Sequence, residues 1–92
     1  MDVTVTFVGP LIEFTGQRKL RFPLPEGALY GDLLDDIDRQ FGDRLPEPMW
    51  DRKQRLFKKG ILVLGSGRDL DFRETPLIDG EEIKIVPVLG GG

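Results

Sequence analysis

The spacing of apolar residues along the chain restricts the possible folds more than any other feature. Apolar residues alternate with polar or smaller ones in residues 3–8, in residues 19–24 and in residues 82–86. A period of two is typical of strands with one buried face. In residues 30–41 the apolar positions instead recur every three or four residues, and Gly42 follows. This segment predicts one amphipathic helix that ends at the glycine.

The remaining segments complete the predicted order of elements. The first two strands are expected to pair through a long connection. Residues 61–64 are a continuous apolar run, which predicts a strand buried on much of both faces. Residues 70–77 predict a short strand or an irregular crossing, and Asp79-Gly80 predicts a turn before the last strand. We therefore expect an α+β, β-grasp (ubiquitin-like) fold, with a mixed sheet of four to five strands and one main helix on one face.

The segment between the helix and the apolar run, residues 43–59, has two interpretations. Its second half is rich in basic and aromatic residues, which is one pattern of nucleic-acid binding. The same residues also suit a surface loop or short helical turn in which Trp50, Leu56 and Phe57 cap the core while the charges face water. We favour the second interpretation.

Acidic residues gather on the predicted helix, at Asp32, Asp35, Asp36 and Asp38. A metal site is one explanation. A solvated helix face explains these side chains better, and the earliest of them suits the positive end of the helix dipole. We therefore predict no metal site.

Length and composition exclude several classes of function. With 92 residues, of which 39% are hydrophobic, the chain suits one domain spanning residues 1–92. It has no cysteine and no histidine, which excludes thiolate and imidazole chemistry and the usual zinc sites. The formal charge of −3 argues against nucleic-acid binding and favours partners with basic surfaces. Neither a membrane span nor a signal pattern is present, so we expect a cytoplasmic protein.

The sequence closes on three glycines, Gly90, Gly91 and Gly92. Glycine makes up about 7% of average sequences, so three at the end would arise by chance roughly once in three thousand chains. A carboxylate that must enter another protein's active site needs a slender, flexible tether, and glycine provides one. We therefore predict a flexible tail, residues 89–92, whose reactive group is the Gly92 carboxylate, with Gly91 beside it. We expect no autonomous catalytic site and no bound cofactor, because an adenylating partner would use ATP to activate this carboxylate.

The parity of the last strand predicts a contact surface beside this tail. Ile83 and Ile85 share one face, expected to be the core, and Val86 and Val88 share the opposite face. Apolar side chains on an outer face are typical of interaction sites. We predict that a partner binds the segment Val86, Pro87, Val88, Leu89 and Gly90.

Six segments of the chain carry motifs of one known family. They are Phe7 to Gly16, Pro25-Glu26-Gly27, Gly31 to Leu34, Gly67-Arg68-Asp69, Thr75 to Ile83 and Ile85 to Gly92. Together they resemble the MoaD/ThiS family of sulfur carriers, with the closer likeness to the small subunit of molybdopterin synthase. The likeness covers most of the chain, and Gly90 stands where the family often has serine or alanine.

This resemblance implies a reaction sequence and a set of partners. A ubiquitin-activating-type adenylating enzyme would activate Gly92, and a sulfur donor such as a rhodanese or a cysteine desulfurase would convert it to a thiocarboxylate. The large subunit of molybdopterin synthase would then bind the cyclic pterin precursor that accepts the sulfur.

Other functions remain compatible with the same tail. The sulfur could serve thiazole synthesis, cysteine synthesis or tRNA thiolation. The chain could instead be a ubiquitin-like modifier joined through Gly92 to lysines of target proteins, or a β-grasp interaction module whose tail is incidental.

Overall fold

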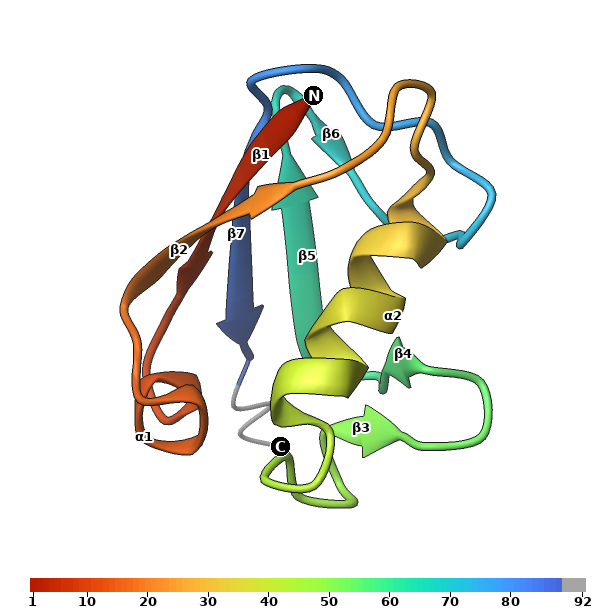
Figure 1. Cartoon of the computed structure of the whole chain (residues 1–92). Coiled ribbons are helices and arrows are strands. Elements are labelled where there is room, and N and C mark those ends of the chain that lie inside the picture. Colours follow the sequence, from red (N-terminus) through yellow and green to blue (C-terminus); the bar gives the residue numbers. More distant parts are fainter. Residues whose placement is uncertain (89–92) are drawn as a thin grey trace.

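The computed structural model describes residues 1–88. These residues form a five-stranded sheet, a hairpin of two short strands and two helices (Figure 1). In chain order the elements are β1 (Asp2–Phe7), α1 (Leu11–Thr15), β2 (Lys19–Pro23), α2 (Tyr30–Phe41), β3 (Trp50–Asp51), β4 (Leu56–Phe57), β5 (Ile61–Gly65), β6 (Arg68–Asp69) and β7 (Glu82–Pro87).

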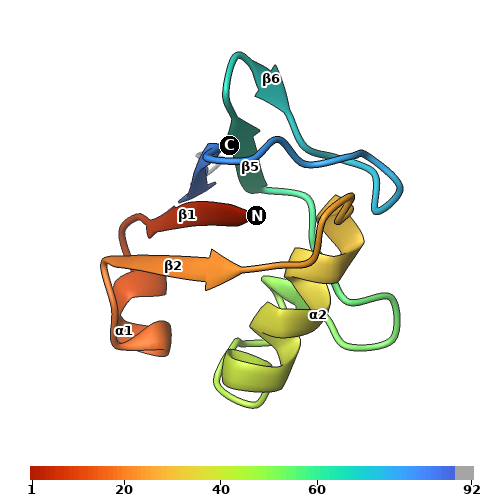
Figure 2. The ribbon, with the colours of Figure 1, turned by 45° about the horizontal axis from the view of Figure 1, so that its top comes forward.

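The sheet has the strand order β2-β1-β7-β5-β6, and helix α2 crosses one of its faces (Figures 1 and 2). Strands β1 and β7 run parallel, with Phe7 opposite Ile85, and the other neighbouring pairs are antiparallel. The first and last strands of the chain therefore lie side by side in the middle of the sheet. This is the β-grasp fold, and the predicted fold class is confirmed.

The predicted periodicities correspond to the buried faces. The inward positions of β1, the apolar stripe of α2 and the inward positions of β7 form one core. Phe41, at the end of α2, packs edge-on against Phe7, with ring centroids 5.8 Å apart. Because Phe7 pairs with Ile85, this contact places the C-terminal end of the helix next to the end of the last strand.

One connection contains an element that the sequence did not indicate. The long connection between β1 and β2 includes the short helix α1, which Gly16 ends in a left-handed conformation.

Residues 70–77 form an irregular crossing, which is one of the two expected alternatives, and an isolated bridge between Leu29 and Pro76 holds it. The crossing approaches the start of α2 so closely that a Cβ atom at Gly31 would lie 3.1 Å from the Arg73 side chain. This close approach explains the glycine in the first turn of the helix.

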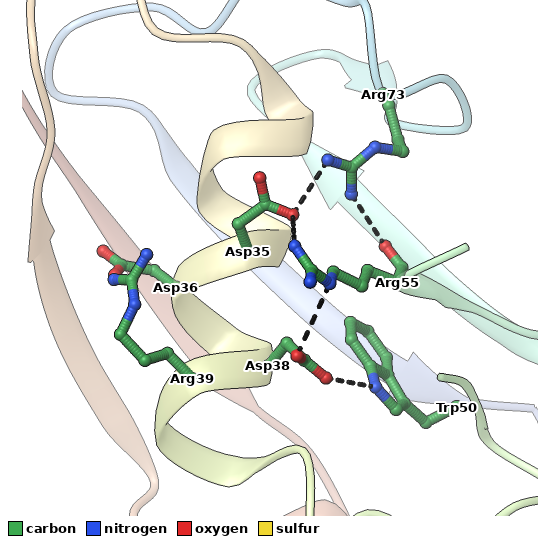
Figure 3. Close-up of polar contacts among 7 residues, drawn as sticks. All are labelled: Asp35, Asp36, Asp38, Arg39, Trp50, Arg55 and Arg73. Carbon is green, nitrogen blue, oxygen red and sulfur yellow. Dashed lines mark hydrogen bonds and ion pairs between the residues drawn. The ribbon is translucent and has the colours of Figure 1, made fainter. Parts of the chain in front are cut away.

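The basic-aromatic segment forms the hairpin β3–β4 rather than a loop or a helical turn. Trp50 is fully buried, and its ring packs edge-on against Phe57 at 4.8 Å. Its indole Nε1 donates a hydrogen bond of 3.0 Å to the Asp38 carboxylate of α2 (Figure 3). The expectation that the aromatic residues cap the core is thus correct. Because the Trp50 ring is buried inside the protein, it cannot stack on bases.

Two aspartates of α2, Asp35 and Asp38, serve this attachment. Asp35 forms ion pairs with Arg55 of the β3–β4 turn and with Arg73 of the crossing, and Asp38 pairs with Arg55 (Figure 3). Asp36 pairs with Arg39 on the same helix. Within residues 1–88, no three acidic side chains gather in a way that would hold a metal ion.

No helix within residues 1–88 combines the length and the apolar character needed to cross a membrane.

Candidate functional site

The predicted site lies at the end of β7, which is an inner strand of the sheet. Its inward side chains, Ile83 and Ile85, are fully buried, and it is bonded to β1 on one side and to β5 on the other. Beyond the strand, the Val88 amide donates a hydrogen bond of 2.6 Å to the Gly60 carbonyl. The chain is therefore fixed up to the residue that precedes the predicted tail.

The structure places three of the predicted partner-binding residues. Val86 and Pro87 are half-buried, and Val88 is 45% exposed. Leu89, Gly90, Gly91 and Gly92 lie outside the described residues. The predicted roles of all seven residues stay predictions.

A neighbouring side chain extends the apolar surface beyond what the sequence indicated. Leu62 of β5 lies directly opposite Val86 in the sheet and is 47% exposed. Val63, one position further along, points inward and is buried. The expectation that residues 61–64 are buried on much of both faces is therefore wrong, because no element of the described chain covers the outer face there. We call Leu62, Val86 and Val88 the outer-face patch.

The same face becomes polar toward the other end of β7. Lys84 lies opposite Thr6 of β1, and Thr6 lies opposite Lys19 of β2. These three residues line a hollow of about 500 Å³, and Ser66 and Glu82 also form part of its lining. The outer face thus presents an apolar end near the predicted tail and an end with two lysines and a carboxylate away from it. Such an arrangement would orient a partner as well as bind it.

The start of β7 is held by a buried carboxylate. The Glu81 side chain is fully buried and accepts two hydrogen bonds from the Arg68 guanidinium, at 2.7 and 2.9 Å. It also accepts the backbone N–H groups of Ser66 and Ile78, at 3.0 and 3.1 Å. A Cβ atom at Gly65 would collide with this carboxylate, so the glycine is required by packing. Glu82, the next residue, is exposed.

The electrostatics of Glu81 make it a source of stability. Burial by itself raises the pKa of the carboxyl, but the Arg68 guanidinium and the two backbone N–H groups more than offset this, so the pKa lies below its ordinary value of 4.5. A carboxyl with a lowered pKa in the folded state stabilises the protein above the unfolded-state pKa. That stability is lost as the pH falls through the lowered folded-state pKa.

We predict that Glu81→Gln lowers the free energy of unfolding at neutral pH by about 2 to 4 kcal/mol, because it leaves the Arg68 charge without its partner. The loss should shrink in acid, where the wild-type carboxyl is itself protonated. Urea unfolding at about pH 7 and about pH 3 measures both effects. Glu82→Gln is the matched control, since Glu82 is exposed. An equal effect of the two substitutions would contradict the assignment.

Comparisons with known proteins agree with this geometry. The model of the ThiS family matches residues 5–92. The small archaeal modifier protein 3 of Haloferax volcanii is 25% identical over 95 residues, and the match covers 100% of both chains.

Two solved structures share the fold. The crystal structure of SAMP1 from Haloferax volcanii has a TM-score of 0.81 at 22% identity and covers 100% of both chains. A Pyrococcus furiosus protein, provisionally assigned as molybdopterin converting factor, subunit 1, has a TM-score of 0.71 at 20% identity and covers 96% of this chain and 98% of its own. The family match, which spans all but the first four residues, establishes the relationship: the chain belongs to the ThiS family of ubiquitin-like sulfur carriers and modifiers.

Proposed function

We propose that this protein carries sulfur as a thiocarboxylate on Gly92 and donates it in the biosynthesis of molybdopterin. The observation that carries the proposal is the combination of a fixed β7 with a glycine tail in a chain that has no cysteine. Sulfur carriers commonly use a thiol as a persulfide, and this chain has none. The carboxylate at the end of the tail is then the group through which sulfur can be bound covalently.

The chemistry of a carboxylate requires an activation step. An oxygen of the Gly92 carboxylate attacks the α-phosphorus of ATP, and pyrophosphate leaves. The resulting acyl-adenylate is a good electrophile, because AMP leaves readily. A persulfide sulfur of the donor protein attacks the acyl carbon and displaces AMP, and a thiol then cleaves the S–S bond to release the thiocarboxylate. Apart from the Gly92 carboxylate itself, every acid, base and nucleophile in these steps belongs to a partner, which agrees with the lack of cysteine and histidine.

The partner surfaces follow from the same geometry. The outer-face patch lies on β7, the strand that leads to the tail, and on its neighbour β5, where Leu62 lies opposite Val86. We propose that the adenylating enzyme and the large subunit of molybdopterin synthase both bind this patch while the tail enters their active sites. Shared use of one patch would make the two complexes mutually exclusive, so the carrier would have to leave one enzyme before it binds the other.

Molybdopterin as the destination is supported by the resemblance to the synthase small subunit and by the fold shared with the Pyrococcus furiosus protein. A strain from which the gene has been deleted tests it. We expect such cells to lack molybdopterin, to accumulate the cyclic pterin precursor, and to recover with the wild-type chain but not with a chain lacking Gly92. Normal molybdopterin together with a loss of thiazole, cysteine or thiolated tRNA would assign the sulfur to another acceptor.

A second function, conjugation to proteins, is favoured by the full-length match to a modifier protein. The sequence defines its signature. Lys84 is the last lysine or arginine of the chain, so trypsin would leave the octapeptide Ile85–Gly92 on a modified lysine rather than a diglycine. Mass spectrometry of cell lysates for lysines that carry this branch distinguishes the two functions, since a dedicated sulfur carrier leaves none.

A further inference from the structure

A groove of about 400 Å³ lies on a different part of the molecule, between the β3–β4 turn and the crossing after β6. It is lined by Gln54, Leu56, Asp71, Phe72, Arg73 and Glu74. Phe72 is the most exposed large apolar side chain of residues 1–88, at 71%. Burying this ring against a partner would remove more apolar surface from water than burying any other single side chain of the described chain.

The walls of the groove are braced against each other. The Arg73 guanidinium donates one hydrogen bond of 2.8 Å to the Asp35 carboxylate of α2 and another of 3.0 Å to the Arg55 carbonyl in the opposite wall (Figure 3). Arg55 has a positive φ of 54°, which is unfavourable for a residue with a side chain. Its ion pairs with Asp35 and Asp38 hold it there. The groove is thus formed before anything binds, which reduces the entropic cost of binding.

The charge at the groove is negative. The positive charges of Arg55 and Arg73 are balanced by the carboxylates of Asp35 and Asp38, with which they form ion pairs. Asp71 and Glu74 are exposed, and neither takes part in any ion pair between residues 1–88. An apolar ring flanked by two uncompensated carboxylates complements an apolar side chain flanked by cations. It would repel the phosphates of a nucleic acid.

The wall of the groove that carries Phe72 lies at the opposite end of α2 from the end of β7. The N-terminal end of the helix is bonded to this wall, the crossing, through the Gly31 amide and the Arg73 carbonyl at 2.8 Å. The other end packs on Phe7, beside the end of β7. The 12 residues of α2 separate the two ends by about 18 Å. A partner bound at Phe72 would therefore leave the outer-face patch free for an enzyme.

We propose that this groove binds a segment of a partner protein that carries one large apolar side chain between lysines or arginines. The inference goes beyond the proposed function and does not depend on the chemistry of Gly92. A second copy of this chain is a poor occupant, because the aromatic residues of its own basic segment, Trp50 and Phe57, are packed against each other inside the protein. The groove would serve to hold the carrier on a second protein while its tail is in use.

A synthetic peptide with one tryptophan between two pairs of lysines tests this proposal. We expect amide NMR signals of residues 54–56 and 71–74 to shift and saturate, with a dissociation constant below about 1 mM. Phe72→Ala, and separately Asp71→Lys combined with Glu74→Lys, should each weaken binding by about tenfold or more. Added salt should weaken the wild-type complex and should not weaken binding by the charge-reversed variant, because there it screens a repulsion.

Matched controls keep the test specific to the groove. Ile78→Ala removes another exposed apolar side chain outside the groove and should change the affinity less than about twofold. A peptide with glutamates in place of the lysines should not bind, and a chain lacking Gly91 and Gly92 should bind as the wild type does. Shifts centred elsewhere, equal binding of the acidic peptide, or no saturable binding would overturn the proposal, as would concentration-dependent shifts of the protein alone that show self-association through the groove.

Discussion

Deleting Gly92 is expected to reduce activation by the adenylating enzyme at least about 100-fold, because the carboxylate would be withdrawn by roughly 3.5 Å from the α-phosphate of ATP. ATP–pyrophosphate exchange measures this step without the later transfer of sulfur. Thermal unfolding should be unchanged, since the deleted residue lies beyond the last hydrogen bond of the described chain, from Val88 to Gly60.

Gly90→Ala is the matched control for this deletion. It keeps the length of the tail and the terminal glycines, and related carriers often have alanine or serine at this place. We expect exchange within about fivefold of the wild type, because one methyl group adds little bulk to the tether. Equal exchange by the deletion variant and the wild type would show that the position of the carboxylate is unimportant. Strong inhibition by Gly90→Ala would instead place the narrow part of the partner's channel around this residue.

Two aspartates in the outer-face patch should weaken binding of the adenylating enzyme by roughly 100-fold, which corresponds to about 2.8 kcal/mol. The variant is Leu62→Asp combined with Val88→Asp. Both side chains are nearly half exposed, at 47% and 45%, so the fold should tolerate the change. In a complex, however, each carboxylate would be buried against an apolar surface without a partner. Titration calorimetry with the purified enzyme gives the affinity.

The control for the patch is Ile78→Asp, which introduces the same charge at an apolar residue that is 52% exposed elsewhere. It should leave the affinity within about twofold of the wild type. An equal loss from both variants would indicate a general effect of negative charge. Unchanged affinity of the double variant would remove the outer-face patch from the interface.

The sequence predicted those parts of the fold that repeat over several residues. The period of two in β1 and β7 and the period near four in α2 each recur over six or more residues, and all three buried faces are confirmed. The parity of β7 also placed Val86 and Val88 correctly on the outer face. Such patterns are local, because the side of a strand or helix on which a residue lies depends only on its neighbours in the chain.

The errors concern features without a local pattern. Strands β3 and β4 have two residues each, too few for a period, and their turn uses Arg55 in a conformation that usually marks glycine. Helix α1 has only five residues. Such short elements form because Trp50 and other side chains pack on the core, which no window of sequence reveals.

Two features of the candidate site have a long-range cause. Glu81 is buried because Arg68, 13 residues earlier in the chain, arrives beside it, and Leu62 is exposed because nothing in the described chain covers the outer face of β5. In the sequence, a charged residue next to a strand gives no sign that it will be buried. A short apolar run likewise gives no sign that one of its side chains will be exposed. The groove at Phe72 likewise joins two segments that only the folded chain brings together.

Intact-mass spectrometry can show directly whether Gly92 carries sulfur. The purified protein is incubated with its adenylating enzyme, ATP and a sulfur donor, and the product is then fragmented. We expect a species in which one oxygen is replaced by sulfur, with the change confined to Gly92. A protein that never gains sulfur under these conditions, or that gains it at another residue, would show that Gly92 is not the sulfur-carrying group.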